Sequence, residues 1–197
     1  MLAPLPAEAP HRAELVEILS GDPLVAIVLE RARSLALRDW MLVSGAIYQT
    51  VWNRRTARPS GHGLKDVDLV WFDPEDLSFE AEDRVIRRAE AVFADLPVPV
   101  ELRNQARVHL WFETRFGSPY APLTSSAESL LRYASICHAV GARLGDDGEL
   151  EVYAPFGLDD VFALRIRPNR VLANAATHAE KAARMKALWP ELTIEPW

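Results

Sequence analysis

The chain has 197 residues, 49% of them hydrophobic and 25% charged, which is the composition of a globular protein with one main core. Its net charge of -6 argues against a protein that coats long stretches of nucleic acid, because such proteins present a basic face to the phosphates. It has no apolar run of the ~20 residues needed to cross a bilayer, no signal-peptide pattern and a single cysteine, Cys137. These features predict a cytoplasmic protein without a disulfide or a membrane contact.

The order of apolar and polar residues predicts alternating helices and strands in the first part of the chain. Asp22 and Pro23 form a helix start, since Asp accepts bonds from free N–H groups and Pro sacrifices none at the first helical position. The apolar run from Asp66 to Phe72 is the clearest strand, and Val85 to Phe93 carry an apolar stripe at helical spacing. The predicted elements are helices over 13–19, 22–38, 46–53 and 82–94, and strands over 40–44, 66–72, 98–102 and 107–113.

This alternation predicts an α/β (α+β) fold, with a mixed sheet and helices packed on it. Beyond Gly117 the signals are mixed: a capping-box spacing from Ser125 to Glu128 starts a helix, residues 150–153 form a strand, and helices cover 158–162 and about 173–188. No linker separates this half. We therefore expect a single domain over 1–197, with a core over about 22–115 and a C-terminal α/β elaboration over about 118–197.

Asp66 and Asp68 are the pair of residues that most needs an explanation. Side chains alternate along a strand, so both carboxylates point to one face while Val67 and Leu69 point to the other. At ~4 Å and an effective dielectric of ~20, two such charges repel by on the order of 4 kcal/mol, so proteins that hold them together normally supply a cation. Oxygen ligands suit magnesium, which completes its shell with water and substrate phosphates. An isolated Asp-x-Asp is more often a solvated strand end, but here the strand continues into an apolar run typical of a central strand.

Three neighbouring features favour a metal and phosphate site. Glu101 lies between apolar residues on the next predicted strand, although an exposed edge glutamate is the alternative. The strand that ends at Gly45 and the helix behind it place backbone N–H groups where an anion can bind. The flexible loop that leads into Asp66 is rich in basic residues, namely Arg54, Arg55, Arg58 and Lys65, although such a cluster alone is more often a solvated loop.

These blocks resemble the DNA polymerase beta-like nucleotidyltransferase superfamily, which has a glycine turn after its first strand, Asp-x-Asp on the second and one acid on the third. More narrowly, the segments MLVSGAIYQTVWN, KDVDLVWFD, ELRNQARVHLWF and APFGLDDVFALRIRPN are similar to a bacterial family of nucleotidyltransferases of unassigned substrate. The similarity spans about Trp40 to Trp189, and the NQARVHLW block is more specific to the family than the acids are.

The resemblance implies that Asp66, Asp68 and Glu101 are catalytic and bind two Mg²⁺ ions, with Mn²⁺ as the alternative ion. One ion would activate the acceptor oxygen, and the other would orient the triphosphate and neutralise the leaving pyrophosphate.

The resemblance also implies that Gly45 lets the backbone approach the β and γ phosphates. The superfamily usually has a serine after this glycine, whereas here Ala46 follows and Ser44 precedes. Ser44 or backbone N–H groups would then replace the hydroxyl contact.

Further residues are candidate substrate contacts. We expect residues 54–65 to form a loop over the nucleotide, with Arg54, Arg55 or Lys65 able to reach a phosphate. Asn104 belongs to the block that follows Glu101. His109 faces the metal site if a turn pairs it opposite Glu101, and a slip of one register turns it away.

The leading hypothesis is transfer of a nucleoside monophosphate from an NTP to a hydroxyl of an unknown acceptor, with release of pyrophosphate. The acceptor is a small molecule, a protein or an RNA end, since the acidic chain argues against extended nucleic acid. The alternatives are a nucleotide-binding module without turnover and an antitoxin-like interaction protein on the same fold.

Overall fold

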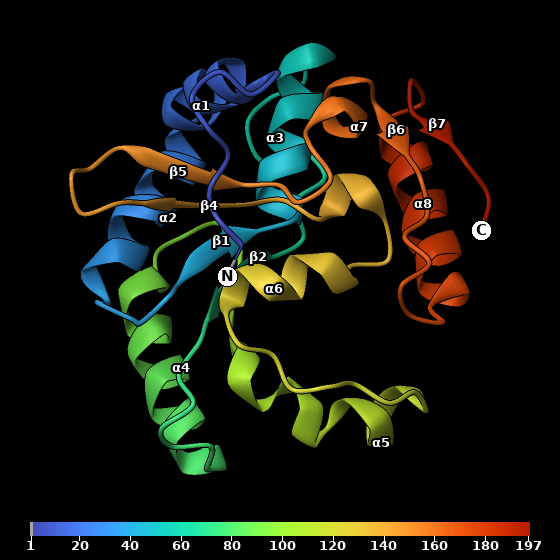
Figure 1. Ribbon diagram of the computed structural model, residues 1–197. Helices are drawn as coiled ribbons and strands as arrows, with labels where there is room; N and C mark the ends of the chain where they lie inside the picture. Colours follow the sequence, from blue (N-terminus) through green and yellow to red (C-terminus); the bar gives the residue numbers. More distant parts are fainter. Residues whose placement is uncertain (1) are drawn as a thin grey trace.

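The structure is a computed structural model that describes residues 2–197. Its centre is a mixed five-stranded sheet in the order β3-β2-β1-β4-β5 (Figure 1). β2 and β3 are parallel, and the other neighbouring strands are antiparallel. The predicted mixed α/β fold is therefore confirmed. The strands are β1 (Met41–Val43), β2 (Val67–Trp71), β3 (Val100–Asn104), β4 (Gly141–Leu144) and β5 (Leu150–Tyr153).

One face of the sheet packs against the larger hydrophobic core. The helices that contribute to this core include α1 (Arg12–Gly21), α2 (Pro23–Ser34), α3 (Gly45–Arg55) and α4 (Phe79–Phe93). The strands contribute alternate apolar residues to this core, such as Leu42 and Leu69. Helix α2 starts as predicted, because Oδ1 of Asp22 accepts hydrogen bonds from the N–H groups of Leu24 and Val25 at 3.0 Å each.

The opposite face carries a smaller core of Met41, Val43 and Val70 with Ala127 and Leu130. Two short helical turns contribute to it, α6 (Ser126–Ser129) and η2 (Leu130–Arg132), whereas Cys137 of the next turn, η3 (Ile136–His138), belongs to the larger core. The predicted cap is present, since the N–H of Glu128 donates to Oγ of Ser125 at 3.2 Å, but the helix behind it is only four residues long.

The C-terminal half completes the main sheet and then leaves it. β4 pairs with β1, so residues 141–153 belong to the same sheet as the acidic strands. The chain continues through α7 (Asp159–Phe162), β6 (Arg165–Ile166), α8 (Ala175–Leu188) and β7 (Thr193–Ile194), and β6 pairs with β7 in a separate parallel ribbon. Helix α8 lies along one side of the molecule (Figure 1). Within residues 2–197, none of the helices is long and apolar enough to span a bilayer.

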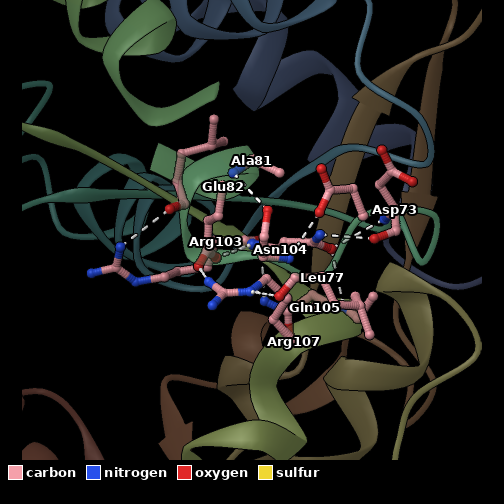
Figure 2. A network of polar contacts seen from close by, with 12 residues as sticks. Asp73, Leu77, Ala81, Glu82, Arg103, Asn104, Gln105 and Arg107 are labelled. Atoms are coloured by element: carbon pink, nitrogen blue, oxygen red, sulfur yellow. Dashed lines mark hydrogen bonds and ion pairs between the residues drawn. The ribbon is translucent and has the colours of Figure 1, made fainter. Parts of the chain in front are cut away.

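The predicted strand over 107–113 is wrong, because the chain there forms η1 (Gln105–Leu110) and α5 (Phe112–Phe116). The side chain of Asn104 causes the turn (Figure 2). Its Oδ1 accepts from the N–H groups of Ala106 and Asp73 at 3.1 Å each, and its Nδ2 donates to the carbonyl of Asp73 at 2.8 Å. These bonds close a turn directly after β3, so the alternating apolar pattern that follows does not become a strand.

A buried ion pair holds the same turn against α4. Arg107 pairs with Glu82, and its Nε donates to the carbonyl of Leu77 at 2.9 Å (Figure 2). Oε1 of Glu82 also accepts from the N–H of Asn104 at 2.9 Å. Helix α4 begins at Phe79, before the predicted start at residue 82, so Glu82 lies in its first turn and faces inward.

Replacement of Arg107 by Met is expected to lower the free energy of unfolding by about 3 kcal/mol, because it leaves the buried Glu82 carboxylate without its cation. Urea unfolding monitored by circular dichroism would measure the loss. The matched control is Arg84→Met, which removes an exposed pair with Asp76 at 3.7 Å and should cause no measurable change. Equal losses in both variants would contradict a special role for the buried pair.

Candidate functional site

Strand register gathers the acidic residues and the glycine turn at one end of the sheet. Asp68 lies opposite Val43 of β1 and opposite Glu101 of β3. β1 runs antiparallel to β2, so its C-terminal end, where Gly45 follows, lies beside the N-terminal end of β2, where Asp66 precedes. β3 runs parallel to β2 and brings Glu101 to the same end.

The turn before α3 has a backbone conformation that is unusual for its residue type. Ser44 has φ 58° and ψ -114°, a region that costs a non-glycine residue about 1–3 kcal/mol and that occurs often at functional sites. Its N–H donates to the carbonyl of Val140 at 2.8 Å, and its side chain is buried. Among the described residues, no hydrogen-bond partner is found for the N–H groups of Gly45 and Ala46. The first turn of α3 therefore presents free donors at this end of the sheet.

Gly45 also has little room for a side chain. A Cβ at this position would lie 3.0 Å from Nε2 of the buried Gln49 and 3.9 Å from Cδ1 of Leu64. The loop that leads into Asp66 therefore passes beside the glycine turn. Lys65 is exposed on this loop, directly before Asp66.

Asp68 lies in a strongly unfavourable environment for a negative charge. Its pKa is raised to about 6, first by burial and then by the negative charge of Asp66, with a smaller contribution from Glu101. The positive charges of Lys181 and Arg103 act in the opposite direction. The charges of four side chains thus act on this carboxylate.

The acids share one region but do not form a preassembled metal site. Across residues 2–197, no group of three or more His, Cys, Asp or Glu side chains is positioned to hold a metal ion. The side chain of Glu101 is 51% exposed, and its Oε2 lies 3.7 Å from Nη2 of Arg103. The donor chemistry nevertheless suits a hard cation, since all three acids offer oxygen, and a bound cation would offset the charge repulsion at Asp68.

Of the predicted substrate contacts, Arg54 lies away from these acids and Asn104 stabilises the fold. Arg54 is near the C-terminal end of α3, and at 1.5 Å per residue it lies ~13 Å along the helix from Gly45. It lines a separate cavity of about 370 Å³ together with Arg58. The side-chain amide of Asn104 is engaged with Asp73 and Ala106, so it shapes the end of β3.

The pairing of His109 opposite Glu101, on which its place at the metal site depended, does not form, because η1 replaces the hairpin. Nδ1 of His109 is buried, and no hydrogen-bond partner for it is found within residues 2–197.

The sequence analysis did not identify two cations near Asp68. Arg103 follows Glu101 by two residues on β3, and this spacing could have indicated that both side chains share a face. Lys181 comes from α8, and no feature of the sequence associates it with a strand more than 100 positions earlier. Both cations line a second cavity of about 450 Å³ between the η1–α5 segment and the start of α8.

The loop before Asp66 is held by contacts with α8 and with Trp189, the residue that follows α8. Nη2 of Arg184 donates to the carbonyl of Gly63 at 3.1 Å, and the rings of His62 and Trp189 meet edge to face at 5.4 Å. Nε1 of the buried Trp189 donates to Oδ1 of Asn53 at 3.0 Å. The C-terminal part of the chain thus positions the entry to β2.

Substitution of Gly63 by Ala is expected to destabilise the protein more than substitution of Gly117 by Ala. Both glycines have φ near +70°, so both variants should lose about 1 kcal/mol through backbone strain. A Cβ on Gly63 would also lie 2.3 Å from the Trp189 ring, which adds ~1–3 kcal/mol, whereas Gly117 faces open space. Urea unfolding of the two variants measures the difference, and equal losses would show that the loop does not pack closely on Trp189.

Replacement of Asp68 by Asn is expected to stabilise the protein at pH 8 in buffer with EDTA. The pKa of Asp68 in the folded state, about 6, lies above its ordinary value of 3.8, so its ionisation destabilises the wild type as the pH rises from about 4 through 6. The gain should reach up to about 3 kcal/mol at pH 8 and vanish near pH 4. Urea unfolding at both pH values tests this, with the exposed Asp159→Asn as control. A less stable Asp68→Asn variant at pH 8 would contradict the assigned environment.

Comparison with solved structures supports the same architecture. A structure determined by NMR, described as a CCA-adding enzyme head domain, matches with a TM-score of 0.75 and 26% identity over 94% of this chain and 96% of that chain. A CCA-adding enzyme in complex with ATP matches with a TM-score of 0.54 and 15% identity over 94% of this chain and 43% of that chain. The Thermotoga maritima CCA-adding enzyme in complex with tRNA matches with a TM-score of 0.54 and 13% identity over 93% and 42%.

The last two similarities show the fold alone, and the chain spans less than half the length of those two enzymes. No curated protein matches the sequence. The sequence model of a protein family described as Nucleotidyltransferase matches residues 30–194, which include Gly45, Asp66, Asp68 and Glu101. The chain therefore belongs to this nucleotidyltransferase family.

Proposed function

We propose that the protein transfers a nucleoside monophosphate from an NTP to a hydroxyl of an acceptor and releases pyrophosphate. The observation that carries the proposal is the register of Asp68 and Glu101 on parallel strands, at the sheet end where Gly45 starts α3. Family membership supports nucleotidyl transfer in general. The substrates, the metal dependence and the roles of individual residues are our proposal.

The donor triphosphate would bind at the start of α3. The free N–H groups of Gly45 and Ala46 and the positive end of the helix dipole suit phosphate oxygens. Lys65 extends from the adjacent loop and would add a positive charge. Because the side chain of Ser44 is buried, backbone N–H groups would replace the usual hydroxyl contact.

Asp66, Asp68 and Glu101 would hold Mg²⁺, or Mn²⁺ as the alternative. Bound in this way, the metal would stabilise the negative charge that develops on the reacting phosphate and on the departing pyrophosphate. The acceptor oxygen would form a bond to the α-phosphorus as the bond from that phosphorus to the bridging oxygen breaks. Pyrophosphate would leave with the electron pair, and the half-exposed Glu101 would pass the hydroxyl proton to solvent.

The related structures are consistent with an NTP as donor. One CCA-adding enzyme was solved with ATP and another with tRNA. For this chain, a small molecule, a protein and an RNA end remain the acceptor classes, and its net charge of -6 disfavours extended nucleic acid. Such a transferase would work in the cytoplasm, where NTPs are made and used.

A nucleotide-binding protein without turnover is the second candidate function. Two observations favour it: Ala46 stands where the superfamily usually has serine, and the three acids do not form a preassembled ligand group within residues 2–197.

Asp66→Asn and Asp68→Asn are each expected to lower Mg²⁺-dependent pyrophosphate release by at least about 100-fold, because each removes a charge that would hold the metal. The assay would supply all four NTPs and a cell extract as the source of acceptor, and would use purified protein at pH 8. Asp159→Asn, an exposed substitution outside the site, is the control and should retain activity.

Thermal melting with each NTP and Mg²⁺ separates the two candidate functions. Stabilisation together with pyrophosphate release supports transfer, whereas stabilisation without it supports binding alone. Undiminished pyrophosphate release in both Asp variants would refute the role of these carboxylates.

A further inference from the structure

A cavity of about 450 Å³ lies between the η1–α5 segment and the start of α8. Its volume is within the range of pockets that enclose one small ligand. The walls come from residues far apart in the sequence, between Arg103 and Lys181. We refer to this cavity as the aromatic cleft, after the rings of Trp111, Phe112, Phe116, Tyr120 and Tyr133 that line it.

Four of the five rings of the aromatic cleft are connected by direct ring contacts. Phe112 lies 4.7 Å from Phe116 and 4.4 Å from Tyr120 between ring centroids, and Trp111 contacts the first two of these rings at 6.2 and 6.4 Å. Phe116 remains 53% exposed, although it is a large apolar side chain. Aromatic surfaces of this kind bind planar rings by stacking.

Cationic side chains gather in the wall of the aromatic cleft, although the chain carries a net charge of -6. The wall contains Arg103, Arg132 and Lys181 and no acidic residue. Arg103 lies 3.7 Å from Glu101 and Arg132 lies 3.6 Å from Glu128, and neither carboxylate lines the cleft. Cζ of Arg132 lies 4.2 Å from the centroid of the Tyr120 ring, over its face, so the cleft presents a cation and an aromatic ring together. The cleft therefore suits a ligand that combines an aromatic ring with an anionic group.

An unpaired acceptor atom adds a directional contact. Asn174 lines the cleft at the start of α8, and its side chain makes no capping hydrogen bond. Its Oδ1 is buried, and no partner for it is found among residues 2–197. A buried oxygen without a donor is costly, so a ligand N–H or O–H group would be favoured here.

The aromatic cleft adjoins the acids on the side opposite the glycine turn. Arg103 lies two residues after Glu101 on the edge strand β3, whereas Gly45 follows β1 on the other side of β2. Lys181 belongs to the cleft wall and also acts electrostatically on Asp68. The aromatic cleft is thus adjacent to the carboxylates, on the side of β3.

We propose that the aromatic cleft binds the acceptor, and that the acceptor is a small molecule of the mononucleotide class, with a planar ring, a phosphate and a hydroxyl. The inference rests on the proposed transfer reaction. In that reaction the attacking oxygen and the leaving pyrophosphate lie roughly in line on opposite sides of the α-phosphorus. If the triphosphate binds at Gly45, the acceptor must therefore approach from the side of β3. The acceptor hydroxyl oxygen forms the new bond to phosphorus, its proton leaves through Glu101, and pyrophosphate departs towards Gly45.

Isothermal titration of the full chain with AMP, CMP, GMP and UMP tests the proposal. EDTA in the buffer suppresses metal-dependent binding at the acids. At least one mononucleotide should bind, and Trp111→Leu and Arg132→Gln should each weaken that binding by about ten-fold, since they remove a stacking ring and a phosphate partner. Arg84→Gln, which changes the same residue type at an exposed position of α4, should leave the affinity unchanged.

Thermal melting of each variant shows whether it folds. Lys181→Met is a third variant of the cleft wall, at an exposed position. Absence of mononucleotide binding, or binding that none of the three variants weakens, overturns the inference. A short oligoribonucleotide that binds ten-fold tighter than every mononucleotide also overturns it, in favour of an RNA end. If Asp68-dependent pyrophosphate release persists in either case, the proposed function stands and only the identity of the acceptor is refuted.

Discussion

The burial of the Asp68 carboxyl group beside the negative charges of Asp66 and Glu101 is the constraint on which the rest of the site depends. Burial and the charge of Asp66 raise the pKa of Asp68 to about 6, so the fold holds a carboxyl group that resists ionisation at the end of the sheet where α3 starts. Two interior strand pairings keep the group in place, with Val43 on one side and Glu101 on the other. The structure thus sacrifices some stability for a concentrated negative potential beside free backbone donors.

Rigid supports surround this strained centre. Asn104 connects the end of β3 to Asp73, two residues after β2, and the buried pair of Glu82 and Arg107 connects the same turn to α4. On the other side, Trp189 holds the loop that enters β2. Because the carboxylates of the site repel one another, neighbouring residues must hold them in position. The contacts that do so come from three separate parts of the chain.

Sequence patterns predicted the elements whose signals are local. The Asp22 cap, the apolar run after Asp66 and the stripe of α4 each depend on residues within one or two turns, and all three elements are present. The segment after Asn104 was mispredicted because its alternation resembles a strand, while one side-chain amide, bonded 31 positions back, decides its geometry. Lys181 was missed for a similar reason, since its place beside Asp68 follows from tertiary packing. The roles of Asp66, Asp68 and Glu101 stay predictions, although the strand register agrees with them.

The pairing of β4 with β1 has a consequence for how this unit can be divided. β1 carries the glycine turn, and its second edge is covered by a strand that arrives about a hundred residues later. A fragment that ended before β4 would leave that edge with unsatisfied amide and carbonyl groups, which invite association with other chains. A shortened protein that kept β1, β2 and β3 but lacked β4 would thus tend to aggregate.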